Sequence, residues 1–87
     1  GGGAPAVLNS ANEEVVAAFL NEEIRFVDIF KTLATVMGKL DETLHHAEPE
    51  CLEEIPNFLL NIKSLEDAIQ ADQWGRKQVG KVLELIN

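Results

Sequence analysis

The densest group of residues able to do chemistry lies in the middle of the chain. Two imidazoles, two carboxylates and a thiol occur within seven residues: His45, His46, Glu48, Glu50 and Cys51. These are groups that bind zinc in proteins. Adjacent histidines point in different directions on a helix, however, and no second cysteine completes a known zinc spacing. We therefore expect a solvated helix end and loop here, and no metal in this chain.

Acidic pairs are the second candidate for chemistry. Glutamates stand side by side at Glu13–Glu14, Glu22–Glu23 and Glu53–Glu54. Two carboxylates act as acid and base when a cleft drives their pKa values apart. Three pairs spread over helical segments are more simply solvated faces. Arg25 and Arg76 could contact a phosphate, but pairing with nearby carboxylates is the simpler expectation. We expect no catalytic residue in this chain.

Two asparagines precede the apolar run VVAAFL. If a helix starts at Ser10, then Ser10 and Glu13 form an S-x-x-E capping box, and Asn9 and Asn12 lie in the entry turn. If it starts near Pro5, both asparagines are interior, with Asn12 inside the apolar arc and Asn9 at its edge. We favour the second interpretation, in which a buried, hydrogen-bonded amide fixes how the helices pack. Either role is structural, because neutral amides cannot act as general acid or base.

Helical periodicity predicts two helices in the first half of the chain. Apolar residues recur every three or four positions from Pro5 to about Glu22, and this face includes Phe19. Asp28 is then expected to be the N-cap of a second helix, which has the clearest apolar periodicity in the chain. Phe26 and Phe30 flank its start and should pack against the first helix.

The second half has a less regular pattern. Residues 41–63 contain two prolines, which break any long helix, and we interpret them as an irregular connection. Ser64 to Asp67 has the pattern S-x-x-D, close to a capping box, so a short helix should start there. Asp72 is expected to cap a last helix over about 73–86, with Trp74 on its apolar face.

Length, composition and charge restrict the class of protein. The 87 residues make one domain over 1–87, and no segment alternates with period two, so we predict an all-α bundle of three or four helices. The net charge of −8 disfavours nucleic acid and anionic membranes as partners. No apolar run approaches the ~20 residues that span a bilayer. The start GGGAPAVLN lacks the basic region of a signal peptide, and a single cysteine fits a reducing compartment.

Both ends of the chain resemble a known family. The stretch GGGAPAVLNSANEEVVAAFLNEEIRFVDI is similar to the opening of the C-terminal helical domain of 1-deoxy-D-xylulose 5-phosphate reductoisomerase. That pattern is approximately GG-x-x-P-A-V-x-N-A-A-N-E, then A-x-x-A-F-L, then I-x-F-x-D-I. The closing pattern S-L-E-x-x-x-x-A-D-x-x-A-R is similar to SLEDAIQADQWGR. The resemblance covers roughly 1–37 and 64–87, and Ser10 and Gly75 each replace an alanine of the pattern.

The resemblance implies a parent enzyme of the non-mevalonate route to isoprenoids. That enzyme rearranges 1-deoxy-D-xylulose 5-phosphate and reduces the product to 2-C-methyl-D-erythritol 4-phosphate, using NADPH and a divalent metal, Mg or Mn. It works as a homodimer in the bacterial cytoplasm or a plastid-type organelle. Its NADPH-binding and catalytic domains lie N-terminal to the region that this chain resembles. The resemblance therefore places no catalytic, cofactor-binding or metal residue on this chain.

Three functions follow, in order of preference. The first is a structural C-terminal domain, non-catalytic by itself, that packs against the other domains of the reductoisomerase. In this interpretation Asn9, Asn12, Glu13, Phe19, Asp28, Asp72 and Trp74 all have structural roles. The second is a free-standing acidic helical module for protein interaction. The third is a metal-binding helical protein.

Overall fold

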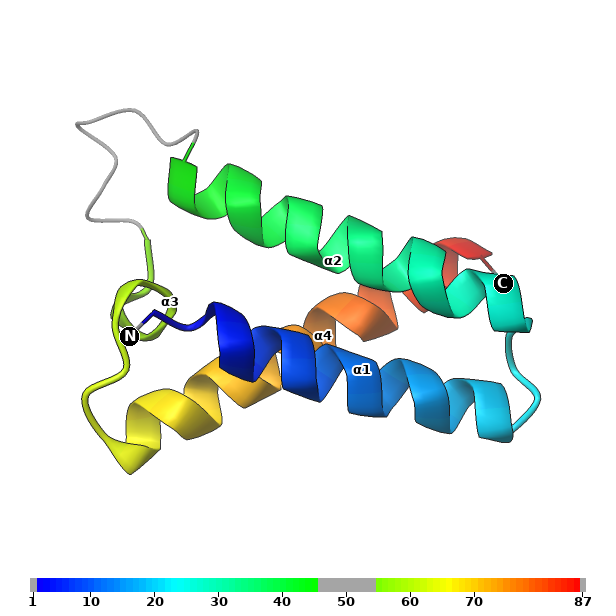
Figure 1. The fold of residues 1–87 in the computed structure, drawn as a ribbon, viewed down its shortest axis with the longest axis horizontal. Helices are drawn as coiled ribbons and strands as arrows, with labels where there is room; N and C mark the ends of the chain where they lie inside the picture. The colour runs from blue at the N-terminus through cyan, green and yellow to red at the C-terminus, as the bar shows by residue number, and fades with distance from the viewer. Residues whose placement is uncertain (1, 46–54, 87) are drawn as a thin grey trace.

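The computed structural model describes residues 2–45 and 55–86. Within them lie four helices: α1 (Ala4–Leu20), α2 (Phe26–His45), α3 (Asn57–Leu60) and α4 (Leu65–Ile86). No strand occurs in these two ranges, and the all-α prediction is confirmed. Figure 1 shows α1 and α2 side by side, joined by a short turn, while α4 crosses behind them. The three long helices contact one another pairwise, and α3 packs on α4.

α1 begins near Pro5, as favoured from the sequence. Proline is suited to a first helical turn, since the N–H that it lacks would have no partner there. At the other end, the N–H groups of Asn21 and Glu23 donate to carbonyls of the last turn, at 3.0 and 2.9 Å. Glu22 between them has a φ of 60°, which a non-glycine residue adopts mainly at helix ends and turns. These residues end α1, as predicted.

The role predicted for Asp28 needs a correction. α2 begins at Phe26, so Asp28 lies in its first turn and Arg25 occupies the N-cap position. The carboxylate of Asp28 reaches back and accepts the backbone N–H of Arg25 at 2.9 Å, with the Arg25 guanidinium at 3.5 Å. This is the acidic half of a capping box. Asp28 therefore caps α2 from within its first turn, three residues after the N-cap position.

The predicted break at Asp72 is wrong, because α4 is one continuous helix. Its start is as expected: the Asp67 N–H donates to Ser64 Oγ at 3.1 Å, and the Lys63 N–H donates to Asp67 Oδ2 at 3.0 Å. Asp72 lies within the helix and binds Arg76 one turn later. An arginine at i+4 stabilises an aspartate inside a helix. The general preference of Asp for N-caps therefore does not decide where Asp72 lies.

The connection between α2 and α4 is described only in part. α2 extends to His45, and α3 is one turn of helix followed by an extended residue, Asn61. Leu59 of α3 is buried in the core, and its carbonyl accepts the Gly3 N–H at 3.0 Å, which ties α3 to the start of α1. Residues 46–54, within the irregular connection predicted over 41–63, lie outside the described ranges.

Small side chains dominate the core between α1 and α4. The fully buried residues of these two helices are Val7, Ser10, Ala11, Val15, Ala71 and Val79. Side chains from α2 and α3 close this core, including Val36 and the larger Leu40 and Leu59. Side chains of this size let two helix backbones approach closely, because interaxial distance depends on the residues at the contact.

The tightest helix contact joins Ser10 of α1 to Gly75 of α4. The Ser10 hydroxyl donates to the Val7 carbonyl at 3.1 Å, within its own helix, so its burial leaves no unpaired polar group. A Cβ at position 75 would lie against Ser10 Oγ and only 2.8 Å from the Val7 oxygen. The two alanines of the resembled pattern that this chain replaces are therefore neighbours. A larger residue on α1 faces a smaller one on α4.

We expect Gly75→Ala to lower the free energy of unfolding by about 1–3 kcal/mol, because the new methyl group overpacks the helix contact. Adding Ser10→Ala should recover part of this loss, since it removes the oxygen nearest to that methyl. Ser10→Ala alone should cost about 1 kcal/mol through the lost hydrogen bond. Urea denaturation of the wild-type chain, the two single variants and the double variant measures the coupling energy between positions 10 and 75.

Gly80→Ala is the matched control for this cycle. Gly80 lies on the same helix, and a Cβ there would have no neighbour within 4 Å. This substitution should raise the free energy of unfolding by about 0.5–1 kcal/mol, through the better helix propensity of alanine. Strictly additive effects of Ser10→Ala and Gly75→Ala would contradict a direct contact between the two positions.

Asp28 predicts a pH dependence of stability. The pKa of its carboxyl is lowered, chiefly by the hydrogen bond from the Arg25 backbone N–H and further by the Arg25 guanidinium. A lowered folded-state pKa contributes stability above the unfolded value of about 3.9, and this is lost as pH falls through the folded pKa. Asp28→Asn should therefore flatten the decline of the urea midpoint below about pH 4. Glu84→Gln, which neutralises an exposed carboxylate, is the control. If the urea midpoint of Asp28→Asn declines below about pH 4 as steeply as that of the wild-type chain, this role of Asp28 is refuted.

Candidate functional site

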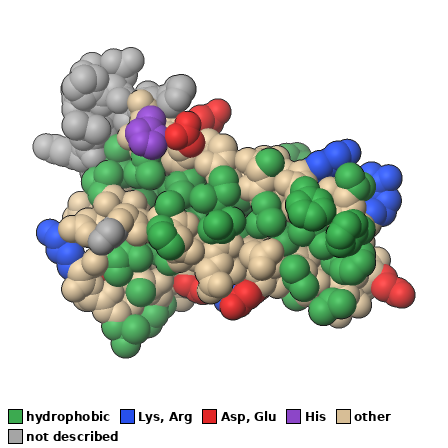
Figure 2. Space-filling view, in the orientation of Figure 1, with side chains coloured by type: hydrophobic (Ala, Val, Ile, Leu, Met, Phe, Trp, Pro, Cys, Tyr) green, Lys and Arg blue, Asp and Glu red, His purple; other side chains and the backbone are tan. Residues whose placement is uncertain are grey.

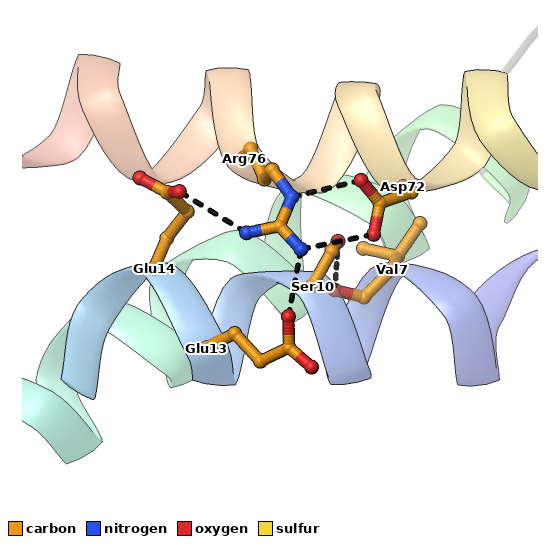
Figure 3. Close-up of polar contacts among 6 residues, drawn as sticks. All are labelled: Val7, Ser10, Glu13, Glu14, Asp72 and Arg76. Atoms are coloured by element: carbon orange, nitrogen blue, oxygen red, sulfur yellow. Dashed lines mark hydrogen bonds and ion pairs between the residues drawn. The ribbon is translucent and has the colours of Figure 1, made fainter. Parts of the chain in front are cut away.

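The largest polar cluster in the described residues forms around Arg76 (Figure 3). Its guanidinium nitrogens lie 2.8 Å from Asp72, 2.7 Å from Glu13 and 3.1 Å from Glu14. Asp72 is on α4 like Arg76, whereas the two glutamates are on α1. The cluster therefore joins the two helices with the tightest contact.

The chemistry of this cluster is charge pairing. Hydrogen bonds to Asp72, then to Glu13, raise the pKa of Arg76 above its already high usual value. All four side chains are between 34% and 57% exposed, so solvent screens the pairs. Glu13 and Glu14 share one guanidinium. An acid–base pair needs an enclosed cleft, and these two carboxylates do not lie in one. The expected pairing of Arg76 with nearby carboxylates is confirmed.

The prediction of a buried Asn12 is wrong. Asn9 and Asn12 are both exposed, although α1 starts where that interpretation required. The buried side of α1 is centred on Val7 and Ala11, and its only buried polar residue is Ser10. Serine can occupy this position because its hydroxyl is short and bonds back to its own helix. Asparagine in the same arc would need a partner from another helix.

The outward side of α1 is also largely apolar. We call it the outer stripe and define it by seven residues, of which Val16 and Phe19 are half-buried against the core: Pro5, Leu8, Asn9, Asn12, Val16, Phe19 and Leu20. Leu8 is 46% exposed and Leu20 is 72% exposed. α1 contains no lysine or arginine, and its two carboxylates bind Arg76. The outer stripe therefore has no charged residue, and an open hollow of about 450 Å³ lies along Pro5, Leu8, Asn9 and Asn12.

Aromatic rings extend the outer stripe at the corner where α1 meets α2. Phe19 and Phe26 pack edge to face with ring centres 5.7 Å apart, and Phe26 and Phe30 do so at 5.5 Å. Phe26 thus packs against the first helix, as predicted. Phe26 and Phe30 are nevertheless 61% exposed each. Figure 2 shows hydrophobic side chains gathered over this end of α1 and α2.

The remaining candidate residues do not form a site among the described parts of the chain. His45 binds Asp41 at 2.6 Å, one turn earlier on α2, and the other four residues weighed as zinc ligands lie outside the described ranges. Trp74 is half-buried and packs against the core. Residues 2–45 and 55–86 contain no group of three or more His, Cys, Asp or Glu placed to hold a metal. None of their helices has the length and apolarity to cross a membrane.

We expect Arg76→Gln to lower the free energy of unfolding by about 1 kcal/mol at low salt, because three neighbouring carboxylates lose their counter-charge. The loss should shrink as salt is added, since the cluster is exposed enough to be screened. Urea denaturation at two ionic strengths measures both effects. Lys77→Gln removes the same charge from an exposed neighbour and should have little effect. Equal losses for the two variants would mean that only net charge matters.

Comparison with known proteins supports the resemblance seen in the sequence. The family model described as the DXP reductoisomerase C-terminal domain matches residues 1–78. Relatives named 1-deoxy-D-xylulose 5-phosphate reductoisomerase include that of Nostoc sp., 40% identical over 79 residues, which are 91% of this chain and 16% of the relative. The relative from Acetivibrio thermocellus is 37% identical over 84 residues, 97% of this chain and 18% of the relative.

A third relative, from Geotalea daltonii, is 36% identical over 80 residues, which are 92% of this chain and 16% of the relative. The chain thus spans less than a fifth of the length of these three relatives. No solved structure matches the chain at a significant level. The match over most of the chain and the identities of 36–40% agree with the residues that first suggested the resemblance. This chain belongs to the family of DXP reductoisomerase C-terminal domains.

Proposed function

We propose that this chain is the structural, non-catalytic domain of an enzyme that converts 1-deoxy-D-xylulose 5-phosphate to 2-C-methyl-D-erythritol 4-phosphate. It docks on the catalytic and NADPH-binding domains of that enzyme and helps to order their active site. NADPH and the divalent metal, Mg or Mn, bind to those domains. The parent enzyme is a homodimer of the bacterial cytoplasm or a plastid-type organelle.

The observation that carries the proposal is the exposed apolar surface. Leu8, Leu20, Phe26 and Phe30 are 46–72% exposed and lie along one helix and its adjoining corner. Burying one such side chain completely contributes about 1.5–3 kcal/mol. An exposed apolar surface of this kind indicates an interaction site. Among the described residues, the most concentrated group of ionisable side chains is the Arg76 cluster, and its charges pair with one another. We therefore assign no step of the reaction to this chain.

The alternative is a free-standing acidic helical module for protein interaction. It is favoured by the fact that α1, α2 and α4 enclose a common core without help from another domain. The two functions predict different genes. A reading frame upstream that encodes a NADPH-binding domain and an acidic metal site supports the reductoisomerase domain. A start codon directly before Gly1 supports the module.

The direct test is reconstitution of activity. A reductoisomerase that lacks its C-terminal helical domain is supplied with 1-deoxy-D-xylulose 5-phosphate, Mg²⁺ and NADPH, and this chain is titrated in. We expect NADPH oxidation to rise saturably, while the chain alone stays inactive. Val15→Asp, which places a charge in the core, should abolish the effect. If the wild-type chain is folded by circular dichroism but never binds the truncated enzyme, the module becomes the better function.

A further inference from the structure

We propose that the outer stripe of α1 is the surface that docks on the rest of the parent enzyme. Its occupant is an uncharged polypeptide surface that offers main-chain peptide groups to Asn9 and Asn12. This inference rests on the proposed function and deepens it by naming the face and the chemistry of its partner. Charge, amide chemistry and position support it.

The distribution of charge separates α1 from the other long helices. α2 and α4 each expose lysines and carboxylates to solvent, including Lys31, Glu42, Lys77 and Glu84. On α1 the only charges are Glu13 and Glu14, and both bind Arg76. α1 thus has apolar residues both on its core side and along the outer stripe, and its two charges lie between these sides. α1 is therefore suited to the middle of an assembly, with α2 and α4 on one side and a partner on the other.

The two amides indicate what the partner offers. Asn9 and Asn12 are three residues apart on one face of the helix, and their side-chain amides hydrogen-bond to no other described residue. Asparagine inside a helix costs roughly 0.6 kcal/mol relative to alanine, and nothing within the described parts of the domain offsets this cost. A carboxamide carries both donors and an acceptor, which match the C=O and N–H of a peptide group. The amides of Asn9 and Asn12, which lie beside Leu8 and Pro5, can therefore pair with the backbone of a docked segment.

The position of the stripe fits the other domains. A C-terminal domain is joined to its enzyme on the N-terminal side of its first helix, and here Gly3, directly before α1, is held against Leu59 of α3. The stripe and its hollow start at Pro5, directly beside that junction. In the relatives, more than four-fifths of the polypeptide lies outside the matched region and can supply the partner surface. A second copy fits less well, since two chains of charge −8 repel each other and the stripe has no cation to offset this.

The test uses the reconstitution assay with variants that leave the domain folded. Asn12→Asp adds a charge at an exposed position without changing its shape. It should raise the half-saturating concentration of the chain about tenfold or more, because docking would bury an unpaired carboxylate. Asn12→Ala removes the amide alone and should raise this concentration about two- to tenfold, the effect of one hydrogen bond. Gln73→Glu, which adds the same charge to an exposed position of α4, should change nothing.

Three results would overturn the inference, after thermal melts by circular dichroism show all variants folded. If the wild-type chain restores turnover and Asn12→Asp does so at the same concentration, the outer stripe is not the docking face, although the proposed function stands. If the wild-type chain neither binds nor restores turnover, the proposed function fails and this inference fails with it. If sedimentation equilibrium shows a dimer that Asn12→Asp dissociates, a second copy occupies the stripe instead.

Discussion

The close contact between α1 and α4 at Ser10 and Gly75 determines much of the rest of the structure. At this contact the backbone of Gly75 lies against the side chain of Ser10, and there is no room for a Cβ at position 75. In this contact α1 is rotated about its axis so that Ser10 and the Val7 backbone face Gly75 of α4. The same approach brings Arg76 within reach of Glu13 and Glu14. One steric constraint thus sets both the ion-pair cluster and the side of α1 that faces solvent.

A helix with two apolar sides has consequences for a small domain. The core is made largely of alanine and valine, and much larger side chains such as Leu20, Phe26 and Phe30 stay on the surface. Covering them would add to the stability of a domain that buries only a modest core. The arrangement is typical of a domain whose full stability and role depend on a larger assembly. It agrees with the family to which the chain belongs, where this region is a small part of a longer enzyme.

The four helix starts predicted from the sequence show how far local chemistry reaches. Pro5 marks the start of α1 and Ser64 caps α4, as their residue types indicate. Asp28 and Asp72 are the same residue type and were both expected at N-caps, but the first caps from within its helix and the second binds an arginine. An aspartate accepts any suitably placed N–H, and the choice depends on which donors the fold brings near. Local sequence signals therefore predicted where these helices lie better than they predicted which group each carboxylate binds.

The sequence by itself determined the helical class, the cap of α4 and the family, and it favoured a start of α1 near Pro5 over one at Ser10, because propensity, capping chemistry and residue pattern are all local properties. It also indicated that Arg76 would pair with carboxylates, though not with which. Only the tertiary structure decided which side of α1 is buried. Apolar residues lie on both sides of that helix, so periodicity alone could not choose between an inward Asn12 and an inward Ser10. The contact with Gly75, sixty-five positions further along the chain, makes that choice.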